Sequence, residues 1–271
     1  MRIGIVGIAG RMGLLLASEV AAAGHAIAGG TLRPGSGKLP PPGVPMFPDL
    51  ATLAAQSDVV IDFTHASTAQ AHAETLQQAG TAWVLGTSGL SAADEAAVAQ
   101  AATQIPLVYA PNFAPGVTLI LALAEQLAAA LPAGSYDAEI VEMHHRQKVD
   151  APSGTAIGLG RAVARGRGVR LEDVMVSGRD GHTGPRPPGA IGFAALRGGQ
   201  VVGEHTLLFA AGDEQIALTH RAFDRRAFAN GAVRAAEWLA GQPPGLYSML
   251  DVLGMPRPAA PRRIPPHPAA P

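Results

Sequence analysis

The sequence predicts an α/β fold with a doubly wound, Rossmann-type parallel sheet plus a second α+β domain that has a mixed, largely antiparallel sheet. Two patterns predict this. Up to about residue 113, short apolar runs alternate with helical segments, which is typical of a parallel sheet covered by helices. From Gly192 onward, apolar runs follow one another across glycine turns, which indicates antiparallel strands. The 271 residues are enough for two such domains.

In the first half, the predicted strands are apolar runs that each end in a polar or glycine turn. With their turns, they are expected at 2–13, 26–33, 57–64, 81–89 and 105–113. Helices are expected at 14–24, at about 67–79 and after Ser91, where Ser91 and Asp94 have capping-box spacing. Ligands of such sheets bind at the carboxyl ends of the strands, so the turns are the candidate site.

The second half begins with a long helix at about 117–131 and a strand near Glu139–Met143. A further helix is expected to start at Ser153, and Asp224 is expected to cap another that runs to about Ala240. The antiparallel strands are predicted to form a meander. These strands are 192–197, 200–210 and 215–222.

Composition and charge exclude several classes of protein. A formal net charge of −1 argues against a nucleic-acid binder, and the absence of cysteine removes disulfides, thiol catalysis and cysteine-based zinc sites. The longest apolar stretch, 117–131, is too short to span a bilayer and contains Glu125. With no secretory signal recognisable, we expect a cytoplasmic protein without a membrane partner. The proline-rich segment 256–271 is predicted to be disordered.

The first strand is followed by the turn GIAGRMG, which spans Gly7–Gly13. Ile8 stands where the dinucleotide fingerprint has its first glycine, whereas Gly10 and Gly13 keep the remaining spacing. The turn alone is also compatible with a plain tight turn, but its position between a strand and a helix favours a dinucleotide site. No acid follows about 20 residues later; Arg33 stands there instead. An arginine without a carboxylate favours the 2′-phosphate of NADPH, and a solvated surface arginine is the alternative.

The segment EIVEMHHRQKVDAPSGT, at 139–155, contains the densest chemistry in the chain. It combines two histidines and a lysine with a Ser-Gly-Thr helix start, whose N–H groups and dipole attract anions. A lone histidine is usually structural, but this combination indicates acid–base chemistry beside a carboxylate-binding site. A zinc site is not expected, because adjacent strand residues point to opposite faces and no third ligand is evident.

These motifs, together with others in the same order, resemble one enzyme family. The matching segments are GIAGRMG, DFT, GTSG, APNFAPGV, HHRQKVDAPSGTA, GEHT and FANGAVRAAEWL. The match covers nearly the whole chain, Met1 to about Leu253, and the paired-histidine segment is highly specific. The chain closely resembles the 4-hydroxy-tetrahydrodipicolinate reductase (dihydrodipicolinate reductase) family of the diaminopimelate route to lysine.

The resemblance implies NAD(P)H-dependent reduction of a cyclic dicarboxylate, with hydride from nicotinamide C4 followed by protonation. It implies a dinucleotide-binding domain at 1–114, completed by 224–255, and a substrate-binding and oligomerisation domain at 115–223. A homotetramer would assemble through the sheets of the substrate domains. The family's acidic ribose-binding position corresponds to Leu32, which departs from the pattern. NADPH is therefore the expected cofactor, and NADH the alternative.

The resemblance also implies site residues. His144 and Lys148 are the expected catalytic residues, since hydride addition creates negative charge that an acid and a cation stabilise. The expected substrate ligands are His145, Ser153, Gly154 and Thr155. With Arg33, the expected cofactor-binding residues are Gly7, Ile8, Ala9, Gly10, Arg11, Met12, Gly86, Thr87, Ser88, Ala110, Pro111, Asn112 and Phe113.

Several polar residues outside these sets keep two interpretations. Asp62 and Thr64 either line the cofactor or begin a turn, and Arg197 either reaches a carboxylate or ends a strand in solvent. His205 is expected to be structural or interfacial, and His25 and His72 to be ordinary helix-end or surface residues.

Two competing functions share part of the pattern. An aspartate- or homoserine-type dehydrogenase would have the glycine turn but no reason to keep KVDAPSGT beside paired histidines. A sensor that binds NADPH without turnover would lose the acid–base cluster.

Overall fold

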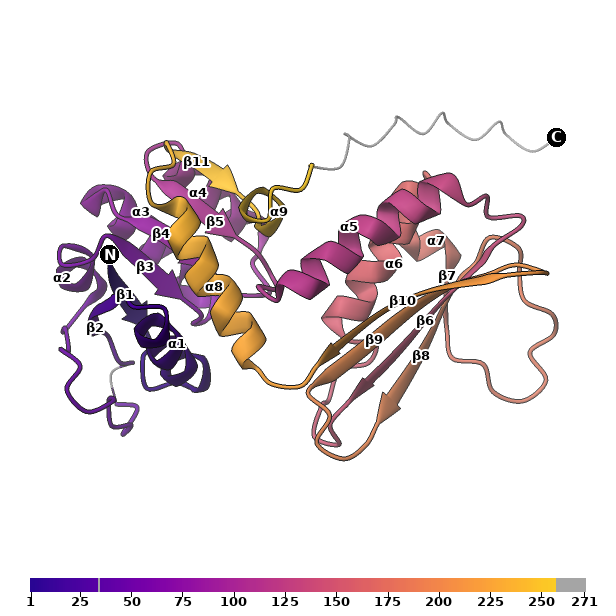
Figure 1. Cartoon of the computed structure of the whole chain (residues 1–271), viewed down its shortest axis with the longest axis horizontal. Helices are drawn as coiled ribbons and strands as arrows, with labels where there is room; N and C mark the ends of the chain where they lie inside the picture. The colour runs from indigo at the N-terminus through magenta and orange to yellow at the C-terminus, as the bar shows by residue number, and fades with distance from the viewer. Residues whose placement is uncertain (34, 257–271) are drawn as a thin grey trace. The chain divides into compact units, whose positions relative to one another are not determined.

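The structure is a computed structural model that describes residues 1–33 and 35–256 (Figure 1). Apart from Pro256, the segment predicted to be disordered lies outside the described residues. The described part of the chain divides into two compact units, Met1–Pro115 with Arg225–Pro256, and Gly116–Asp224. None of the described helices has the length and apolarity needed to cross a membrane.

The first unit contains a six-stranded sheet in the order β11-β5-β4-β3-β1-β2. Its strands are β1 (Arg2–Val6), β2 (Ala26–Gly30), β3 (Val59–Asp62), β4 (Ala82–Leu85), β5 (Pro106–Tyr109) and β11 (Gly245–Tyr247). All neighbouring pairs are parallel, which confirms the predicted Rossmann-type sheet. Strand β11 returns from the far end of the chain to pair with β5, and its three residues are too short for a sequence pattern to reveal.

Helices cover both faces of this sheet. One apolar core joins Ile3, Ile5 and Ile61 to α1 (Arg11–Ala22), α8 (Arg226–Leu239) and α9 (Met249–Val252). A second core joins the strand residues of opposite orientation to α2 (Leu50–Ala54), α3 (Ala69–Ala79) and α4 (Ala92–Ala102). The short 3-10 turn η1 (Ala66–Thr68) precedes α3. Alternate residues of each strand therefore face different helix layers, as expected for a buried parallel sheet.

Helix starts follow the local chemistry of the sequence. The predicted capping box of Ser91 and Asp94 is confirmed at the start of α4. Helix α1 ends before Gly24, whose φ of 77° suits glycine. The predicted Asp224 cap is wrong by one residue, because Arg225 occupies the N-cap position of α8.

The second unit contains a five-stranded mixed sheet in the order β10-β9-β6-β8-β7. Its strands are β6 (Asp137–His144), β7 (Met175–Ser177), β8 (Ile191–Arg197), β9 (Gly203–Ala210) and β10 (Gln215–Ala222). Helices α5 (Pro115–Ala130) and α6 (Gly154–Gly166) lie on one face of the sheet, with α7 (Leu171–Val174) beside them (Figure 1).

The predicted meander is correct for its second hairpin and wrong for its first. Strands β9 and β10 are antiparallel neighbours. Strand β8 does not pair with β9, because β6 lies between them and runs parallel to β8. The turn at Gly198 crosses the end of β6 instead, where the Gly198 N–H donates to the His144 carbonyl at 3.0 Å.

The central strand β6 determines where the polar residues of this unit lie. Its even-numbered residues are buried, and Ala138 and Ile140 pack in the core with Leu207 and Phe209 of β9. Glu142 and His144 continue the same face toward the carboxyl end of the strand. A carboxylate and an imidazole are thus placed under the start of α6.

Candidate active site

The predicted cofactor residues of the first unit lie at the carboxyl edge of its sheet. Gly7–Met12 follow β1, Gly86–Ser88 follow β4, and Ala110–Phe113 follow β5, while Arg33 comes shortly after β2. These strands lie together in one parallel sheet, so the turns meet at one edge. The structure thus brings the predicted set into one region of this unit.

The glycine turn has the close contacts of a dinucleotide fingerprint. Gly7 adopts a φ of 67°, and its carbonyl accepts the Gly10 N–H at 2.8 Å. A Cβ at Gly13 would lie 2.4 Å from the Gly7 oxygen, so only glycine allows α1 to approach the strand this closely. Gly10 is the N-cap of α1, and Arg11 and Met12 begin the helix. The N–H groups of the first turn have no hydrogen-bond acceptor within the helix, and they point out of its N-terminal end.

Ile8 occupies the place of a glycine because its side chain belongs to the core. It is fully buried, its N–H donates to the Thr31 carbonyl at 3.1 Å, and a Cβ at Gly30 would lie 2.5 Å from its side chain. The missing glycine is therefore offset by Gly30 on the neighbouring strand. Ile8 and the buried Ala9 support the turn from below.

The turns after β4 and β5 provide further polar groups. Thr87 is 3% exposed, and within the described residues its buried hydroxyl has no hydrogen-bond partner, whereas Ser88 is exposed. A buried hydroxyl of this kind fits a site that receives a polar ligand. The Gly86 N–H donates to the Asp62 carbonyl at 2.8 Å. In the last turn Ala110 and Phe113 are buried, Pro111 is exposed, and Asn112 accepts the Ala114 N–H at 2.9 Å.

A buried carboxylate organises the end of β3. Asp62 accepts the N–H and the hydroxyl of Thr64, at 2.9 and 2.6 Å, and contacts His72 Nδ1 at 2.7 Å. His72 is therefore a hydrogen-bond partner of a buried carboxylate, not the ordinary surface residue that was expected. Thr64 in turn packs near Gly7, whose added Cβ would lie 3.2 Å from the Thr64 methyl group. Asp62, held by His72, thus fixes Thr64 in the position where it packs against the glycine turn.

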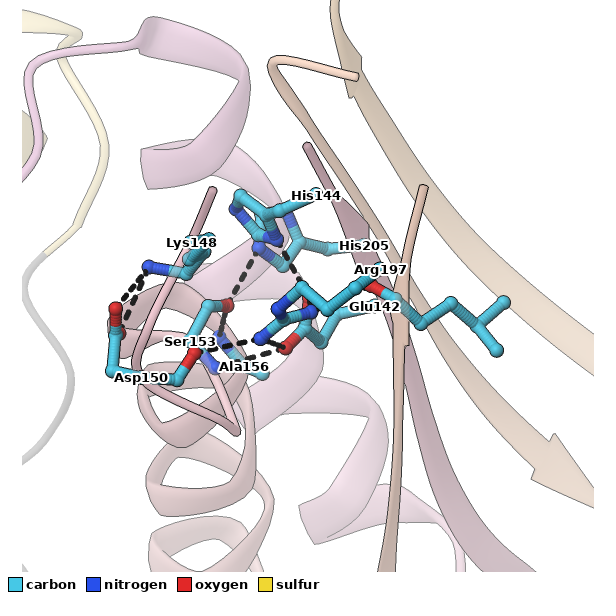
Figure 2. Close-up of polar contacts among 9 residues, drawn as sticks. Glu142, His144, Lys148, Asp150, Ser153, Ala156, Arg197 and His205 are labelled. Atoms are coloured by element: carbon cyan, nitrogen blue, oxygen red, sulfur yellow. Dashed lines mark hydrogen bonds and ion pairs between the residues drawn. The ribbon is translucent and has the colours of Figure 1, made fainter. Parts of the chain in front are cut away.

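In the second unit, Glu142 is the centre of a polar network that sequence reasoning missed (Figure 2). Its side chain is 1% exposed. Its carboxylate accepts hydrogen bonds from His144 Nδ1 at 2.6 Å, from the Ser153 N–H at 3.1 Å and from both Arg197 Nη atoms at 2.8 Å. Strand alternation could have found Glu142, because it points to the same face as Ile140 and His144.

Arg197 reaches a carboxylate, as one of its two interpretations predicted, but the carboxylate is that of Glu142 in the protein itself. Besides Glu142, it donates to the Asp150 carbonyl at 2.7 Å. Burial by itself raises the pKa of Glu142, but the hydrogen bonds from Arg197 and His144 hold that pKa below its usual value. Glu142 is therefore ionised near neutral pH and can stabilise positive charge on His144.

The His144 ring is buried and oriented by Glu142. Because Nδ1–H donates to the carboxylate, Nε2 is the atom left for proton exchange. Gly203 leaves space at this nitrogen, since a Cβ there would lie 3.0 Å from Nε2. Burial lowers the pKa of His144, and the Glu142 carboxylate opposes that shift.

The start of α6 forms the next part of the network. Ser153 is the N-cap, and its hydroxyl oxygen accepts the Ala156 N–H at 3.2 Å. The same hydroxyl lies 2.9 Å from His205 Nε2, and the residue is 2% exposed. Both the N–H and the hydroxyl of Ser153 are therefore used inside the protein. Gly154 and Thr155 follow it in the first turn of the helix.

The two remaining predicted residues lie in the loop after β6. Lys148 Nζ donates to both carboxylate oxygens of Asp150 at 2.8 Å, and Figure 2 shows this pair beside the Ser153 end of α6. His145 follows the last strand residue, and its Nδ1 is buried with no hydrogen-bond partner among the described residues. Within the described ranges, no group of three or more His, Asp or Glu side chains is arranged to hold a metal ion.

Comparison with known proteins covers nearly the whole chain. The family model described as dihydrodipicolinate reductase, N-terminus, matches residues 1–113, and the C-terminus model matches 116–253. A 4-hydroxy-tetrahydrodipicolinate reductase of Granulibacter bethesdensis is 73% identical over 94% of this chain and 97% of its own length. A 4-hydroxy-tetrahydrodipicolinate reductase of Gluconacetobacter diazotrophicus is 61% identical over 94% of this chain and 98% of its own length. A solved structure, the dipicolinate-bound dihydrodipicolinate reductase from Paenisporosarcina sp. TG-14, is 25% identical, with a TM-score of 0.77 over 93% of this chain and 98% of that one. The chain belongs to the dihydrodipicolinate reductase family.

Proposed function

We propose that the chain reduces 4-hydroxy-tetrahydrodipicolinate to tetrahydrodipicolinate with a nicotinamide cofactor, and that His144 delivers the proton. Family membership makes the chain an NAD(P)H-dependent oxidoreductase of lysine biosynthesis. The observation on which the proposed site depends is the buried Glu142–His144 pair beside the start of α6. It places a proton donor next to a group of anion-binding N–H groups.

In the first unit, the proposed cofactor site is the set of turns at the carboxyl edge. The first turn of α1 would hold the pyrophosphate with its N–H groups and dipole. The Thr87 hydroxyl, which has no hydrogen-bond partner among the described residues, and the Asn112 turn would contact the rest of the dinucleotide. When bound, the cofactor supplies a hydride from nicotinamide C4; the residues of the chain only bind and orient it.

In the second unit, the proposed substrate site is the first turn of α6 with His145. The Paenisporosarcina relative binds dipicolinate, a flat ring dicarboxylate. We infer the same chemical class for this chain, with one carboxylate at Gly154 and Thr155 and the other at His145. The Ser153 hydroxyl is already bonded internally, so Ser153 contributes by holding the turn.

Proton delivery would follow from the orientation of His144. For the stated product to form, the 4-hydroxyl group and a hydrogen of the adjacent ring carbon must also leave as water, so that one hydride and one proton are consumed and one water is released. Hydride addition to the resulting conjugated ring leaves negative charge on the ring system, and the neighbouring carbon takes a proton from Nε2. Glu142 stabilises the imidazolium through Nδ1, as a carboxylate does in other carboxylate–histidine pairs. Lys148 would add positive charge near the same turn, although Asp150 binds its ammonium group in this structure.

We also propose that the chain forms a homotetramer through the sheet of the second unit. The face of the second sheet opposite α5 and α6 is half-exposed, with Val141, Met143 and Leu208 among its residues. The hydroxyls of Thr206 and Thr219 pair across it at 3.1 Å. A mixed surface of this kind, on a sheet with helices on one side only, suits packing against a second copy of the chain.

The function is tested by following NADPH and NADH oxidation separately while the preceding synthase makes the unstable substrate from pyruvate and aspartate semialdehyde. We expect oxidation that depends on the synthase. A chain that binds the cofactor but shows no synthase-dependent oxidation would contradict the proposed reaction.

Arg33→Ala is expected to weaken NADPH binding by about 10–100-fold, the value of a charge-assisted contact to a 2′-phosphate, and NADH binding by less than about twofold. Arg33 is exposed and follows β2, where the adenosine ribose of such cofactors lies. Titration of both cofactors by fluorescence measures the effect, with Lys38→Ala as the control for a nearby exposed cation. Equal losses for NADPH and NADH would refute the 2′-phosphate role.

The pH dependence of turnover is expected to have an alkaline limb set by His144, because only the imidazolium can donate the proton. Burial lowers the pKa of His144 in the free chain. The alkaline limb of kcat/KM, which reports this pKa, should therefore lie below the usual pKa of an imidazole. A bound dicarboxylate adds negative charge that raises the pKa, so the limb of kcat lies at higher pH. Coincident limbs, or the same limb in a His144→Gln variant, would exclude this assignment.

A further inference from the structure

His205 occupies a position that connects the two parts of the proposed substrate site. It lies on β9 directly opposite Glu142 of β6 in the antiparallel register. Its side chain is on the helix-covered face, where the residue is 4% exposed. Its ring lies edge-on to the His144 ring, with centroids 5.1 Å apart, and its Nε2 lies 2.9 Å from the Ser153 hydroxyl (Figure 2).

Three hydrogen bonds involve the N–H and the hydroxyl of Ser153. Its N–H donates to Glu142 Oε1, its hydroxyl oxygen accepts the Ala156 N–H, and the same hydroxyl is bonded to His205. Without His205, the hydroxyl could rotate away from the Ala156 N–H or toward the substrate. A histidine beside it in a closed core removes this freedom, because neither group can exchange its partner for water.

The charge state of His205 suits a structural hydrogen bond and not proton transfer to substrate. Burial, with nearby His144 as the next cause, lowers the pKa of His205 to about 4. It is therefore neutral at physiological pH and does not compete with His144 for the negative charge of Glu142.

We propose that His205 is a positioning residue of the reaction: through the Ser153 hydroxyl it fixes the first turn of α6, where the substrate carboxylate binds. This rests on the proposed function. Glu142 of β6 binds the Ser153 backbone N–H and His205 of β9 binds the Ser153 hydroxyl, so two neighbouring strands together position the N-cap residue. Small displacements of such a site are costly, since a 1 Å error can lower activity about 100-fold.

The sharpest test compares two amides at position 205. In His205→Gln the side-chain amide reaches about as far as Nε2 does and can keep the hydrogen bond to the Ser153 hydroxyl. In His205→Asn the amide is shorter, reaches only the position of Nδ1, and cannot form this hydrogen bond. Pyridine-2,6-dicarboxylate is the probe, titrated by calorimetry with NADPH present, and KM and kcat come from the synthase-coupled assay. We expect His205→Asn to raise the probe's Kd and the substrate KM about 10-fold with kcat changed less than about threefold. His205→Gln should recover most of this loss.

A double-mutant cycle with Ser153→Ala then shows whether His205 acts through Ser153. We expect the Asn substitution to cost little in the Ser153→Ala background, because the bond is already absent. His220→Asn is the matched control, since His220 is the cross-strand neighbour of His205 on β10 and has no contact with Ser153 among the described hydrogen bonds; it should bind the probe normally.

Three results would overturn the proposal: unchanged probe binding in His205→Asn, equal losses in the Asn and Gln variants, or losses that add in the cycle. Thermal unfolding and NADPH titration check that each variant is folded, and the Gln variant together with Ser153→Ala keeps the test decisive if His205→Asn does not fold. Failure of the unmodified chain to oxidise cofactor with substrate would refute the proposed function instead, whatever the variants do.

Discussion

Replacing His144 with Gln is expected to lower kcat by about 10²–10⁴-fold, the usual contribution of a general acid. The reason is local: Nε2 is the one ring nitrogen left for proton exchange, because Nδ1 is bonded to Glu142. NADPH affinity should change by less than about twofold, since the proposed cofactor turns belong to the first unit. Steady-state kinetics in the coupled assay and a cofactor titration measure both effects.

The control for this variant is His25→Gln. His25 also contacts a carboxylate, that of Glu237, at 2.8 Å, but it lies in the first unit near the opposite ends of the strands. Its replacement should leave turnover within about twofold. Normal turnover in His144→Gln would remove His144 from the mechanism.

Glu142→Gln is expected to reduce both turnover and stability. The variant loses the charge that supports the His144 imidazolium, and it leaves the half-buried Arg197 guanidinium without the Glu142 carboxylate. Removing one partner of a buried ion pair costs about 3–5 kcal/mol, and the partial exposure of Arg197 favours the lower end. Urea unfolding at pH 7 should therefore show a free energy of unfolding lower by about 3 kcal/mol, and kcat should fall by at least about 10-fold.

The loss of stability in Glu142→Gln should depend on pH. The pKa of Glu142 is lowered in the folded chain, so its contribution to stability is present above the carboxyl pKa of the unfolded chain and is lost as pH falls toward the folded value. The difference between the unmodified chain and Glu142→Gln should shrink on acidification. Glu125→Gln is the matched control, because its pair with the half-exposed Arg165 should be worth less than about 1 kcal/mol. Equal stability losses in the two variants would contradict a special role for Glu142.

The fold of the first unit could be predicted because its signals are local. Each strand is a short apolar run with its own turn, and alternation with helices implies parallel pairing. The second sheet was harder for a physical reason. Gly198 and Gly199 signal a turn after β8, but a turn does not reveal which strand the chain will pair with next. Strand β6, about 50 residues earlier, takes the place between β8 and β9.

The same distinction separates the site residues that could be predicted from those that could not. His144 and Ser153 lie within one segment, so their proximity follows from the sequence. Arg197 and His205 reach the site through pairing registers, His144 opposite Arg197 and Glu142 opposite His205, which no local pattern specifies. Glu142 was within reach of strand alternation, but a glutamate in a strand is usually solvated, and only its position between two buried neighbours indicates otherwise.

The most direct test of the account is the turnover of the Glu142→Gln/His144→Gln double variant compared with the two single variants. If Glu142 acts by orienting and charging His144, the double variant should have a kcat within about threefold of His144→Gln alone, because residues that act as a unit are not additive. Losses that multiply would show that Glu142 acts on the reaction independently of His144, which would contradict the claim that the two residues act as one proton-donating pair.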